Sequence, residues 1–475
     1  MYSLDDTIAA ISTPVGEGGI GIVRMTGPDA AGILQQVFRA GSGSASAGTE
    51  RARSGHDLDG PPARRLAPYH LRYGYIIDPS RDDVVDEVLA VFMPAPRTYT
   101  RQDVVEINGH GGIVALRRIL ALCLGLGARL AEPGEFTARA FLHGRLDLAQ
   151  AEAVLDIVRA KTEKSLDAAI GQLAGHLSSE VRAVRAILVE ALAYVEASID
   201  FVEDEIPDHD IGPVLKESST IVSRLLVDAD RGIIYRQGVR VAIVGQRNVG
   251  KSSLLNRLLR TGRAIVTDIP GTTRDTLEET LNLQGVPVVL VDTAGMASQA
   301  EDLVERLGIE RSRVALDQAD LALLVVDTSQ PFAETDEAII ELIGDRPAIA
   351  VLNKMDLPVD ACWREQVSFD VPCISISALT GRGLGALEDA IVEMVFSGQV
   401  LAAAAPVVTS PRHKAALSRA LDHIDSAQKA HRGGLSLDFV AIDLTAAVNA
   451  LGEITGQTVS EDLLETIFGN FCIGK

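Results

Sequence analysis

The sequence predicts a multidomain protein in which two α/β parts are combined with an all-α part. Its 475 residues exceed what one hydrophobic core serves, so two to three domains are expected. An apolar run at 239–244 leads through a glycine loop into a helical pattern at 253–259. Apolar residues at three- and four-residue steps precede and follow this central segment, which indicates helices on both of its sides.

The N-terminal 145 residues contain the short apolar runs typical of a mixed α/β domain. Runs at 7–11 and 20–25 flank a glycine-rich segment, which we expect to be a hairpin loop. This segment matches G-x-G-x-x-G, but it leads into a strand and not into a helix, so a dinucleotide-binding loop is rejected. The elements expected next are strands at 84–93 and 104–107, the stretch Gly109-His110-Gly111-Gly112 and a helix at 113–126.

The helical part is predicted from one long apolar stripe between residues 147 and 201. Its members are Leu177, Val181, Val184, Leu188, Ala191 and Val195. Ser410-Pro411 signals another helix, with serine at the N-cap and proline in the first turn. Helices on both sides of the central segment favour one helical domain into which an α/β domain is inserted, and stripes of this length can also pack between subunits of a dimer. The predicted boundaries are 1–145, 146–236, 237–397 and 398–475.

The amino-acid composition excludes several classes of protein. The net charge of −21 argues against a surface generally adapted to nucleic-acid phosphates. The four cysteines form no C-x-x-C pair, so neither a disulfide framework nor a zinc site is expected. The N-terminus lacks the pattern of a signal peptide, and no apolar stretch reaches membrane length. We therefore expect a cytoplasmic protein.

The central segment opens with a phosphate-binding loop, G-x-x-x-x-G-K-[ST], at residues 245–252. Gly245 and Gly250 allow backbone N–H groups to turn toward a polyphosphate. Lys251 is predicted to reach the β- and γ-phosphates, and Ser252 to offer its hydroxyl to Mg²⁺. The loop residues assigned to nucleotide binding are Asn248, Val249, Gly250, Lys251, Ser252 and Ser253.

The base is predicted to be guanine. The sequence Asn353-Lys354-Met355-Asp356 follows an apolar strand, and Asp356 can accept hydrogen bonds from both N1–H and the exocyclic amine of guanine. Adenine has no such donor pair, so the carboxylate would lose its partners. Ser377-Ala378-Leu379 follow a further strand and are expected to support this contact.

Two further motifs complete the set that is typical of GTP-binding domains. Asp292-Thr293-Ala294-Gly295 end an apolar run, which would bring Asp292 near the metal and the Gly295 N–H to the γ-phosphate. The loop after the first helix contributes Thr267, Asp268, Ile269, Pro270, Gly271, Thr272 and Thr273, of which Thr273 would complete the Mg²⁺ shell. Ras-like GTPases usually carry glutamine where Met296 stands, so another group must position the attacking water. Asn248 can ligate a monovalent cation over the phosphates or simply brace the loop.

Beyond these motifs, the chain resembles the MnmE (TrmE) family of tRNA-modification GTPases over essentially its whole length. The stretches that carry the resemblance are Gly109-His110-Gly111-Gly112, Pro133-Gly134-Glu135-Phe136-Thr137, residues 146–153 (LDLAQAEA) and the tail Phe471-Cys472-Ile473-Gly474-Lys475. The resemblance implies a dimeric, folate-binding N-terminal domain that takes 5-formyltetrahydrofolate, and a Ras-like P-loop GTPase domain inserted in a helical domain. It also implies a function, which is to add an aminomethyl or carboxymethylaminomethyl-type group to C5 of the wobble uridine of tRNA. A flavoprotein partner, MnmG or GidA, would take part, and GTP hydrolysis would drive conformational change.

The resemblance also assigns residues. The folate contacts would be Arg24, Glu106, Arg145 and Lys475. Family members usually carry lysine where Arg145 stands, which keeps the charge but not the geometry. The potassium ligands would be Asn248, Thr267, Ile269 and Thr272. Glu305 corresponds to the family's water-organising glutamate, with one extra residue between it and Gly295, and Arg247 replaces a usual proline.

Cys472 lies fourth from the end of the chain, but the residues after it do not make a prenylation signal. The resemblance suggests a thiol that assists the chemistry at uridine C5. The alternative is a buried tail cysteine that packs near the folate pocket, and both interpretations stay open. The residues assigned to catalysis are Lys251, Asn248, Glu305 and Cys472.

Two other functions compete with this hypothesis. A regulatory or ribosome-assembly GTPase switch would need an RNA-binding appendage, such as a KH module or a basic tail, and neither is recognised in the sequence. A folate-binding scaffold with a vestigial nucleotide site is disfavoured because the phosphate and metal residues are intact: Lys251, Ser252, Thr273 and Asp292.

Overall fold

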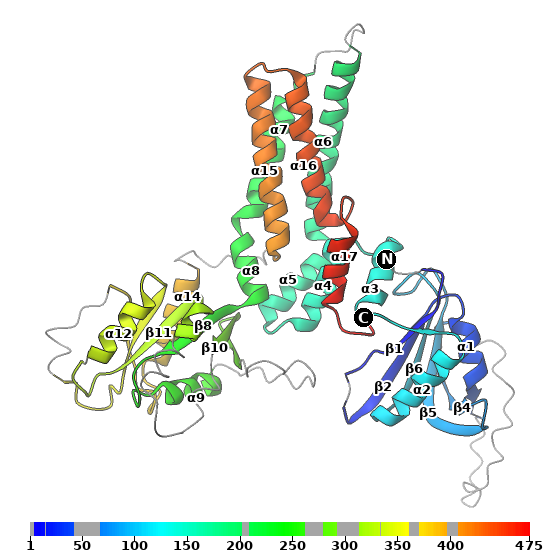
Figure 1. Cartoon of the computed structure of the whole chain (residues 1–475), viewed down its shortest axis with the longest axis horizontal. Coiled ribbons are helices and arrows are strands. Elements are labelled where there is room, and N and C mark those ends of the chain that lie inside the picture. The colour runs from blue at the N-terminus through cyan, green and yellow to red at the C-terminus, as the bar shows by residue number, and fades with distance from the viewer. Residues whose placement is uncertain are drawn as a thin grey trace, which may run out of the picture. The chain divides into compact units, whose positions relative to one another are not determined.

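The computed structural model describes residues 4–14, 16–41, 67–201, 209–261, 279–291, 313–332, 334–360, 370–396 and 407–475. The chain splits into two compact units (Figure 1). The first unit comprises Met1–Leu155 and Thr455–Lys475, and the second comprises Asp156–Ile454. Among the described residues, no helix has both the length and the apolar character that crossing a membrane requires.

The first unit is built on a seven-stranded sheet with the order β3-β4-β5-β6-β2-β1-β7 (Figure 1). The strands are β1 (Ile8–Ile11), β2 (Gly18–Thr26), β3 (Phe38–Ala40), β4 (Arg72–Asp78), β5 (Asp83–Met93), β6 (Val104–Gly111) and β7 (Arg129–Leu130). All pairs are antiparallel except β1 with β7. The expected hairpin is confirmed, because β1 and β2 pair with Ile8 opposite Thr26.

Helices α1 (Ala30–Val37) and α2 (Ile113–Gly125) share a hydrophobic core with this sheet. Ile33 and Leu116 from the helices are buried with strand residues such as Val23 and Ile107, which are 0 % exposed. The other helices here are α3 (Glu135–Leu142), the start of α4 (Leu148–Arg159) and α17 (Glu461–Gly469), whose N-cap is Ser460. Phe468 of α17 packs with Leu148 and Ala138, so the end of the chain is part of the first unit's core.

Strand β6 is longer than the sequence predicted. Gly109, His110 and Gly111 belong to the strand and do not form a turn before α2. The reason is steric, since Gly111 pairs with Gly18 of β2, and a Cβ on Gly111 would lie 2.2 Å from the Gly18 carbonyl oxygen. Glycine at this position therefore permits the close approach of two strands. In the sequence alone, the same glycine residues indicate a turn.

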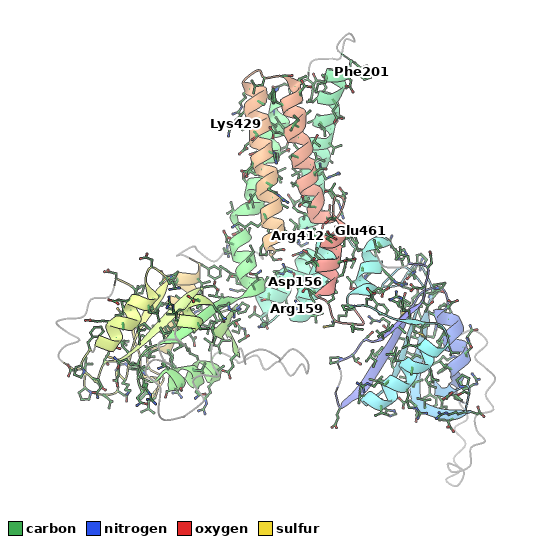
Figure 2. All side chains as sticks on the ribbon, in the orientation of Figure 1. Asp156, Arg159, Phe201, Arg412, Lys429 and Glu461 are labelled. Atoms are coloured by element: carbon green, nitrogen blue, oxygen red, sulfur yellow. The ribbon has the colours of Figure 1, made fainter. Side chains whose placement is uncertain are left out.

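The second unit contains the helical part of the chain. Its helices are α5 (Glu163–Leu173), α6 (His176–Asp200), α7 (Gly212–Val227), α8 (Ala229–Gln237), α15 (Pro411–Arg432) and α16 (Leu437–Thr455). The predicted apolar stripe of α6 is buried along its whole length. Hydrogen bonds join helices from both sides of the α/β segment, because Ser219 donates to Asp425 and Arg185 to the carbonyl of Val448. Phe201 and Lys429 lie toward one end of this bundle, and Arg412 and Asp156 toward the other (Figure 2).

The α/β part of the second unit is a six-stranded sheet with the order β13-β12-β11-β8-β10-β9. The strands are β8 (Val239–Val244), β9 (Glu279–Leu283), β10 (Val286–Val291), β11 (Leu321–Asp327), β12 (Ala348–Asn353) and β13 (Cys373–Ser375), and the helices are α9 (Lys251–Thr261), α12 (Glu334–Ile343) and α14 (Leu384–Val395). All pairs are parallel except β9 with β10. The predicted fold class, α/β parts combined with a helical part, is confirmed.

Candidate functional sites

The phosphate loop leaves β8 after Val244 and enters α9 at Lys251. Three loop residues have positive φ angles: Gly245 (147°), Asn248 (62°) and Gly250 (101°). A Cβ on Gly245 would lie 2.2 Å from the carbonyl oxygen of Val325, and one on Gly250 would lie 2.2 Å from Nδ2 of Asn353. Only glycine fits at either position, so the loop is held close to the sheet with its backbone free of side chains.

Lys251 is anchored within this loop. Its Nζ donates to the carbonyl oxygens of Gly245 at 2.8 Å and Gln246 at 2.5 Å. Burial lowers the pKa of Lys251, and the nearby charge of Arg247 lowers it further. Ser252 and Ser253 are exposed in the first turn of α9. The positive end of the helix dipole and the adjacent ammonium make this an attractive position for an anion.

Asn353 ties the phosphate loop to the two predicted base-binding segments. It is 2 % exposed, and its Nδ2 donates to the Val249 carbonyl at 2.7 Å. Its Oδ1 accepts from the backbone N–H of Ala378 at 3.0 Å. One buried amide therefore fixes the spacing between the loops after β8, β12 and β13. The side chain that the sequence assigned to nucleotide binding acts here on the protein backbone.

Asp356 is exposed at the end of β12, where its Oδ1 accepts from the Ser377 hydroxyl at 2.5 Å. Ser377 is 1 % exposed, and its oxygen also accepts from the backbone N–H of Thr380 at 3.1 Å. Met355 donates through its backbone N–H to the carbonyl of Ile376 at 3.1 Å. Ser377 thus orients the carboxylate that is predicted to select guanine, whereas the side chain of Leu379 is 78 % exposed.

Lys354 has a partner that the sequence did not reveal. Its φ angle is 65°, and its Nζ donates to Oδ2 of Asp327 at 2.6 Å. Burial raises the pKa of Asp327, but hydrogen bonds from Lys354 and Ser329 outweigh it and bring the pKa below the ordinary value. Asp327 ends β11, the strand between β8 and β12, so only the sheet order brings it beside the lysine.

Several predicted residues lie outside the described residues. They are Thr267, Asp268, Ile269, Pro270, Gly271, Thr272, Thr273, Asp292, Thr293, Ala294, Gly295 and Glu305. Of the ligands predicted for Mg²⁺ and K⁺, Ser252 and Asn248 belong to the described part, and both are exposed at the phosphate loop. Within the described part of the chain, no group of three or more His, Cys, Asp and Glu residues could hold a metal by itself.

A second candidate site lies in the first unit, where Arg24 of β2 faces Glu106 of β6. The two residues are register partners, and Nε of Arg24 donates to Oε1 of Glu106 at 2.8 Å. The guanidinium also donates to the carbonyl of Gly474 at 3.3 Å and lies 5.8 Å from the ring centroid of Phe136. The two predicted folate residues are therefore joined to each other and to the C-terminal tail.

The tail is held against β1 by close backbone contacts. Gly474 has a φ angle of 94°, and a Cβ there would lie 2.6 Å from the Ile11 carbonyl oxygen. Its own carbonyl accepts from the Ser12 hydroxyl at 3.1 Å. Ile473 forms a β-bridge with Pro133, and the Cys472 carbonyl accepts from the N–H of Gly134. These contacts fix the tail within the first unit.

Cys472 is exposed, so the expectation of a buried tail cysteine was wrong. Its backbone is held by the hydrogen bond from the Gly134 N–H to its carbonyl, although the residue is exposed. Lys475 is half-buried, and burial lowers its pKa. The charge of Arg24 lowers the pKa of Lys475 further, whereas Cys472 acts in the opposite direction. Arg24 is joined to this end of the tail through the carbonyl of Gly474.

Arg145 completes the second site through Tyr99. Its guanidinium carbon lies 4.7 Å from the Tyr99 ring centroid, and the Tyr99 hydroxyl lies 2.9 Å from that of Thr137. Burial raises the pKa of Tyr99. The sequence did not single out Tyr99, Phe136 or Thr137 as site residues. The stretch Pro133-Gly134-Glu135-Phe136-Thr137 marks this region in the sequence, but its composition does not identify a ligand.

Comparison with known proteins places both halves of the chain in one family. A family model described as "GTP-binding protein TrmE N-terminus" matches residues 7–145, and one described as "MnmE helical domain" matches residues 148–472. The chain is 49 % identical over 476 residues to the "tRNA modification GTPase MnmE" of Chloroflexus aurantiacus, which covers 99 % of this chain and 100 % of that protein. The protein of the same name from Roseiflexus sp. is 50 % identical over 485 residues, with 99 % of each chain covered. The one from Alkaliphilus oremlandii is 48 % identical over 480 residues, with 100 % of each chain covered.

Proposed function

This chain belongs to the MnmE (TrmE) family of tRNA modification GTPases, and we propose that its GTP hydrolysis serves the modification of the wobble uridine, U34. The product would carry an aminomethyl or carboxymethylaminomethyl-type group on C5, and 5-formyltetrahydrofolate would supply the one-carbon unit. The observation that supports this chemistry most directly is the meeting of the tail with the Arg24–Glu106 pair. It brings Arg24 and Glu106 together with the tail that carries Cys472 and Lys475.

The cationic groups of this site suit a folate. Arg24, Arg145 and Lys475 can bind the carboxylates of the ligand, and Glu106 can accept from the N–H groups of a pterin ring. The ring of Tyr99 lies under the guanidinium of Arg145, at 4.7 Å from its carbon. Its half-buried ring offers a flat apolar surface for stacking.

In the nucleotide site, we assign Mg²⁺ to the hydroxyls of Ser252 and Thr273 and potassium to Asn248, Thr267, Ile269 and Thr272. Both cations would neutralise negative charge that develops on the phosphates. Asn248 supports this assignment, because it is exposed on the loop in the left-handed conformation that asparagine tolerates. Glu305 would orient the attacking water in place of the glutamine that Met296 replaces.

The remaining assignments follow from the family. We propose a cytoplasmic homodimer that acts on tRNA with the flavoprotein MnmG (GidA) and without a membrane. The domain boundaries at 145, 236 and 397 belong to the same proposal. GTP hydrolysis would drive movement of the nucleotide-binding part, and the net charge of −21 is consistent with tRNA binding through a local surface or through the partner.

Mass spectrometry of tRNA nucleosides tests the proposed modification. Cells that lack the gene should lose the C5-modified wobble uridine, and the full-length gene should restore it. A gene with Lys251→Ala should fail to restore it, which links the modification to the nucleotide site. Unchanged wobble uridines in the deletion strain would instead favour a regulatory or ribosome-assembly switch.

Turnover in different alkali-metal salts tests the role of Asn248. GTP hydrolysis should be faster in potassium than in sodium at equal ionic strength, because a bound cation replaces the charge of an arginine finger. Asn248→Ala should remove the difference between the salts. Equal rates in both salts for the unaltered protein would leave Asn248 with only a bracing role.

Cys472→Ser tests whether the exposed thiol takes part in the chemistry at C5. The serine hydroxyl keeps the size of the side chain and leaves the tail's backbone contacts in place. If the thiol is catalytic, wobble-uridine modification should be lost while folate binding and GTP hydrolysis are retained. Normal modification by this variant would remove the catalytic assignment.

A further inference from the structure

A buried network of charged side chains lies at the N-terminus of α3. Glu135 and Arg139 are both 0 % exposed, and NH2 of Arg139 donates to Oε1 of Glu135 at 2.9 Å. Arg129 of β7 adds two hydrogen bonds to the same carboxylate, from NH2 to Oε1 at 2.6 Å and from NH1 to Oε2 at 3.1 Å. Glu135 also accepts from the backbone N–H of Glu132 at 2.9 Å. This one carboxylate therefore has four donors.

The two arginines extend the network to the beginning of the chain. Arg129 donates from Nε to Oδ2 of Asp6 at 2.7 Å, and Arg139 donates from NH2 to Oδ1 of the same residue at 2.5 Å. NH1 of Arg139 also donates to the Asp6 carbonyl at 2.8 Å and to Oε1 of Gln102 at 3.1 Å. Three segments that are distant in sequence, around Asp6, around Gln102 and from Arg129 to Arg139, are thereby fixed to one another.

Such a network is a poor device for stability alone. Removing ions from water costs several kcal/mol for each ion, and well-packed apolar residues often give equal or greater stability. Its hydrogen bonds, in contrast, have strict geometry, so they fix position and orientation. The network is therefore suited to holding neighbouring residues in place.

The residues next to Glu135 contact each part of the second site. Gly134 donates to the Cys472 carbonyl, and a Cβ on Gly134 would lie 2.5 Å from the carbonyl oxygen of Phe468. Phe136 lies under the guanidinium of Arg24 at 5.8 Å. Thr137 bonds to the Tyr99 hydroxyl, over whose ring Arg145 lies. Three successive contacts along one helical turn thus reach the tail, the Arg24–Glu106 pair and the Tyr99–Arg145 pair.

We propose that Glu135, held by Arg129 and Arg139, is a positioning residue for the site in the first unit. It fixes the first turn of α3, which in turn places the C-terminal tail with Cys472 and orients Arg24 and Tyr99. Glu135 itself is fully buried and acts on a ligand only through these neighbours. This inference rests on the proposed folate function for the identity of the ligand, but not for the placement of the tail.

The test is Glu135→Gln in the full-length protein. The amide keeps the size of the side chain but loses the charge, so the donors of Arg129 and Arg139 lose their strong acceptor. Isothermal titration should show that 5-formyltetrahydrofolate binds about tenfold more weakly. This is the lower end of the loss in affinity seen when a residue that orients a metal ligand by a hydrogen bond is removed. GTP turnover should stay unchanged.

Thiol alkylation reports on the tail without any folate. Peptide mapping after a brief iodoacetamide pulse gives the rate at Cys472 relative to Cys373, an exposed cysteine of the second unit that serves as internal reference. Glu135→Gln should change this ratio several-fold. The matched control is Asp156→Asn, which breaks the part-buried pair between Arg236 and Asp156, at 2.8 Å, in the second unit. It should leave both the ratio and folate binding unchanged even where it lowers the melting temperature.

The outcomes separate this inference from the proposed function. If the unaltered protein binds no folate, the proposed function fails, and the alkylation ratio still tests the placement of the tail. If Glu135→Gln changes neither the ratio nor folate affinity, the positioning role is wrong. Should this variant fail to fold, Arg129→Lys is the milder change, because Arg129 is 39 % exposed and lysine keeps the charge while it loses the two-pronged bond to Glu135 and the bond from Nε to Asp6. Wild-type values of the ratio and affinity for Arg129→Lys would likewise overturn the proposal.

Discussion

In the second unit, the described residues around the phosphate loop come from three short segments, each at the carboxyl end of a parallel strand. In the first unit, the corresponding site joins the two ends of the chain, since Arg24 and Gly474 are hydrogen-bonded across 450 positions of sequence. The parallel strands β8, β12 and β13 bring their loops to one edge of the sheet by topology. The first-unit site instead depends on the docking of a tail on an antiparallel sheet.

This difference teaches how far each site can be changed on its own. A loop that binds phosphate through its backbone tolerates varied neighbours, provided that the glycines and the lysine are kept. A site assembled from a tail, a strand pair and a helix turn is sensitive to residues that touch no ligand. The two sites should therefore respond differently to substitution, and four predictions test this contrast.

The largest effect is expected for Lys251→Ala. Removing the ammonium at the phosphate loop should lower the turnover number for GTP roughly 10²–10³-fold, the range found when one preorganised donor to a developing charge is lost. Folate binding, measured by titration, should be unchanged because the residue belongs to the other unit. A simultaneous loss of folate affinity would show that the two sites do not respond independently.

The next effect concerns the base. Asp356→Asn should weaken GTP binding about 100-fold, since two hydrogen bonds to a charged acceptor contribute about 1.5 kcal/mol or more each. Xanthosine triphosphate, which presents an acceptor where guanine has its amine, should compete better with the variant than with the unaltered protein. If the two nucleotides compete as before, Asp356 does not read the base.

In the first unit, Arg24→Ala should weaken folate binding about 10-fold or more, because one charged hydrogen-bond donor contributes about 1.5–3 kcal/mol. The same change should raise the alkylation rate of Cys472, since the guanidinium also donates to the tail at Gly474. GTP turnover serves as the control and should not change. Unaltered folate affinity would exclude Arg24 from the site.

The smallest effect is a pH dependence at Asp6. Burial raises the pKa of this carboxyl, but Arg129 and Arg139 together bring it below its ordinary value of 3.8. The ion pairs therefore stabilise the folded unit fully above pH 3.8, and this contribution is lost as the pH falls through the lowered pKa. Because Asp6 is partly exposed, the loss should be no more than about 1 kcal/mol.

Denaturant unfolding at a series of pH values measures this contribution. Asp6→Asn should lower stability at neutral pH and should flatten the fall of stability toward acid pH. Asp78→Asn is a suitable comparison, because Asp78 is exposed, has a lowered pKa through bonds to Ser80, and lies outside the network. An identical pH profile for Asp6→Asn and the unaltered protein would show that these ion pairs contribute nothing.

Much of the fold could be predicted from the sequence where pattern and motif coincide. Strands Val239–Val244, Val286–Val291 and Ala348–Asn353 were expected because each apolar run ends in a recognisable loop. Strand β11 (Leu321–Asp327) was not named, since an apolar run without a motif behind it does not distinguish a strand from a buried helix. Strand β4 (Arg72–Asp78) was missed because Arg72 and Tyr73, at its start, are both exposed and do not continue the apolar alternation.

The candidate sites divide in the same way. The sequence by itself determined the phosphate-loop motif, the carboxylate that is predicted to read guanine, and the family, because these depend on residue type at short, fixed spacing. Only the tertiary structure decided that Asn353 joins three loops, that Lys354 pairs with Asp327, and that the exposed Cys472 lies on a tail bonded to Arg24. These contacts depend on the sheet order and on the docking of the tail. Hydrogen bonds between distant segments produce no periodic pattern in the sequence, so the sequence does not predict them.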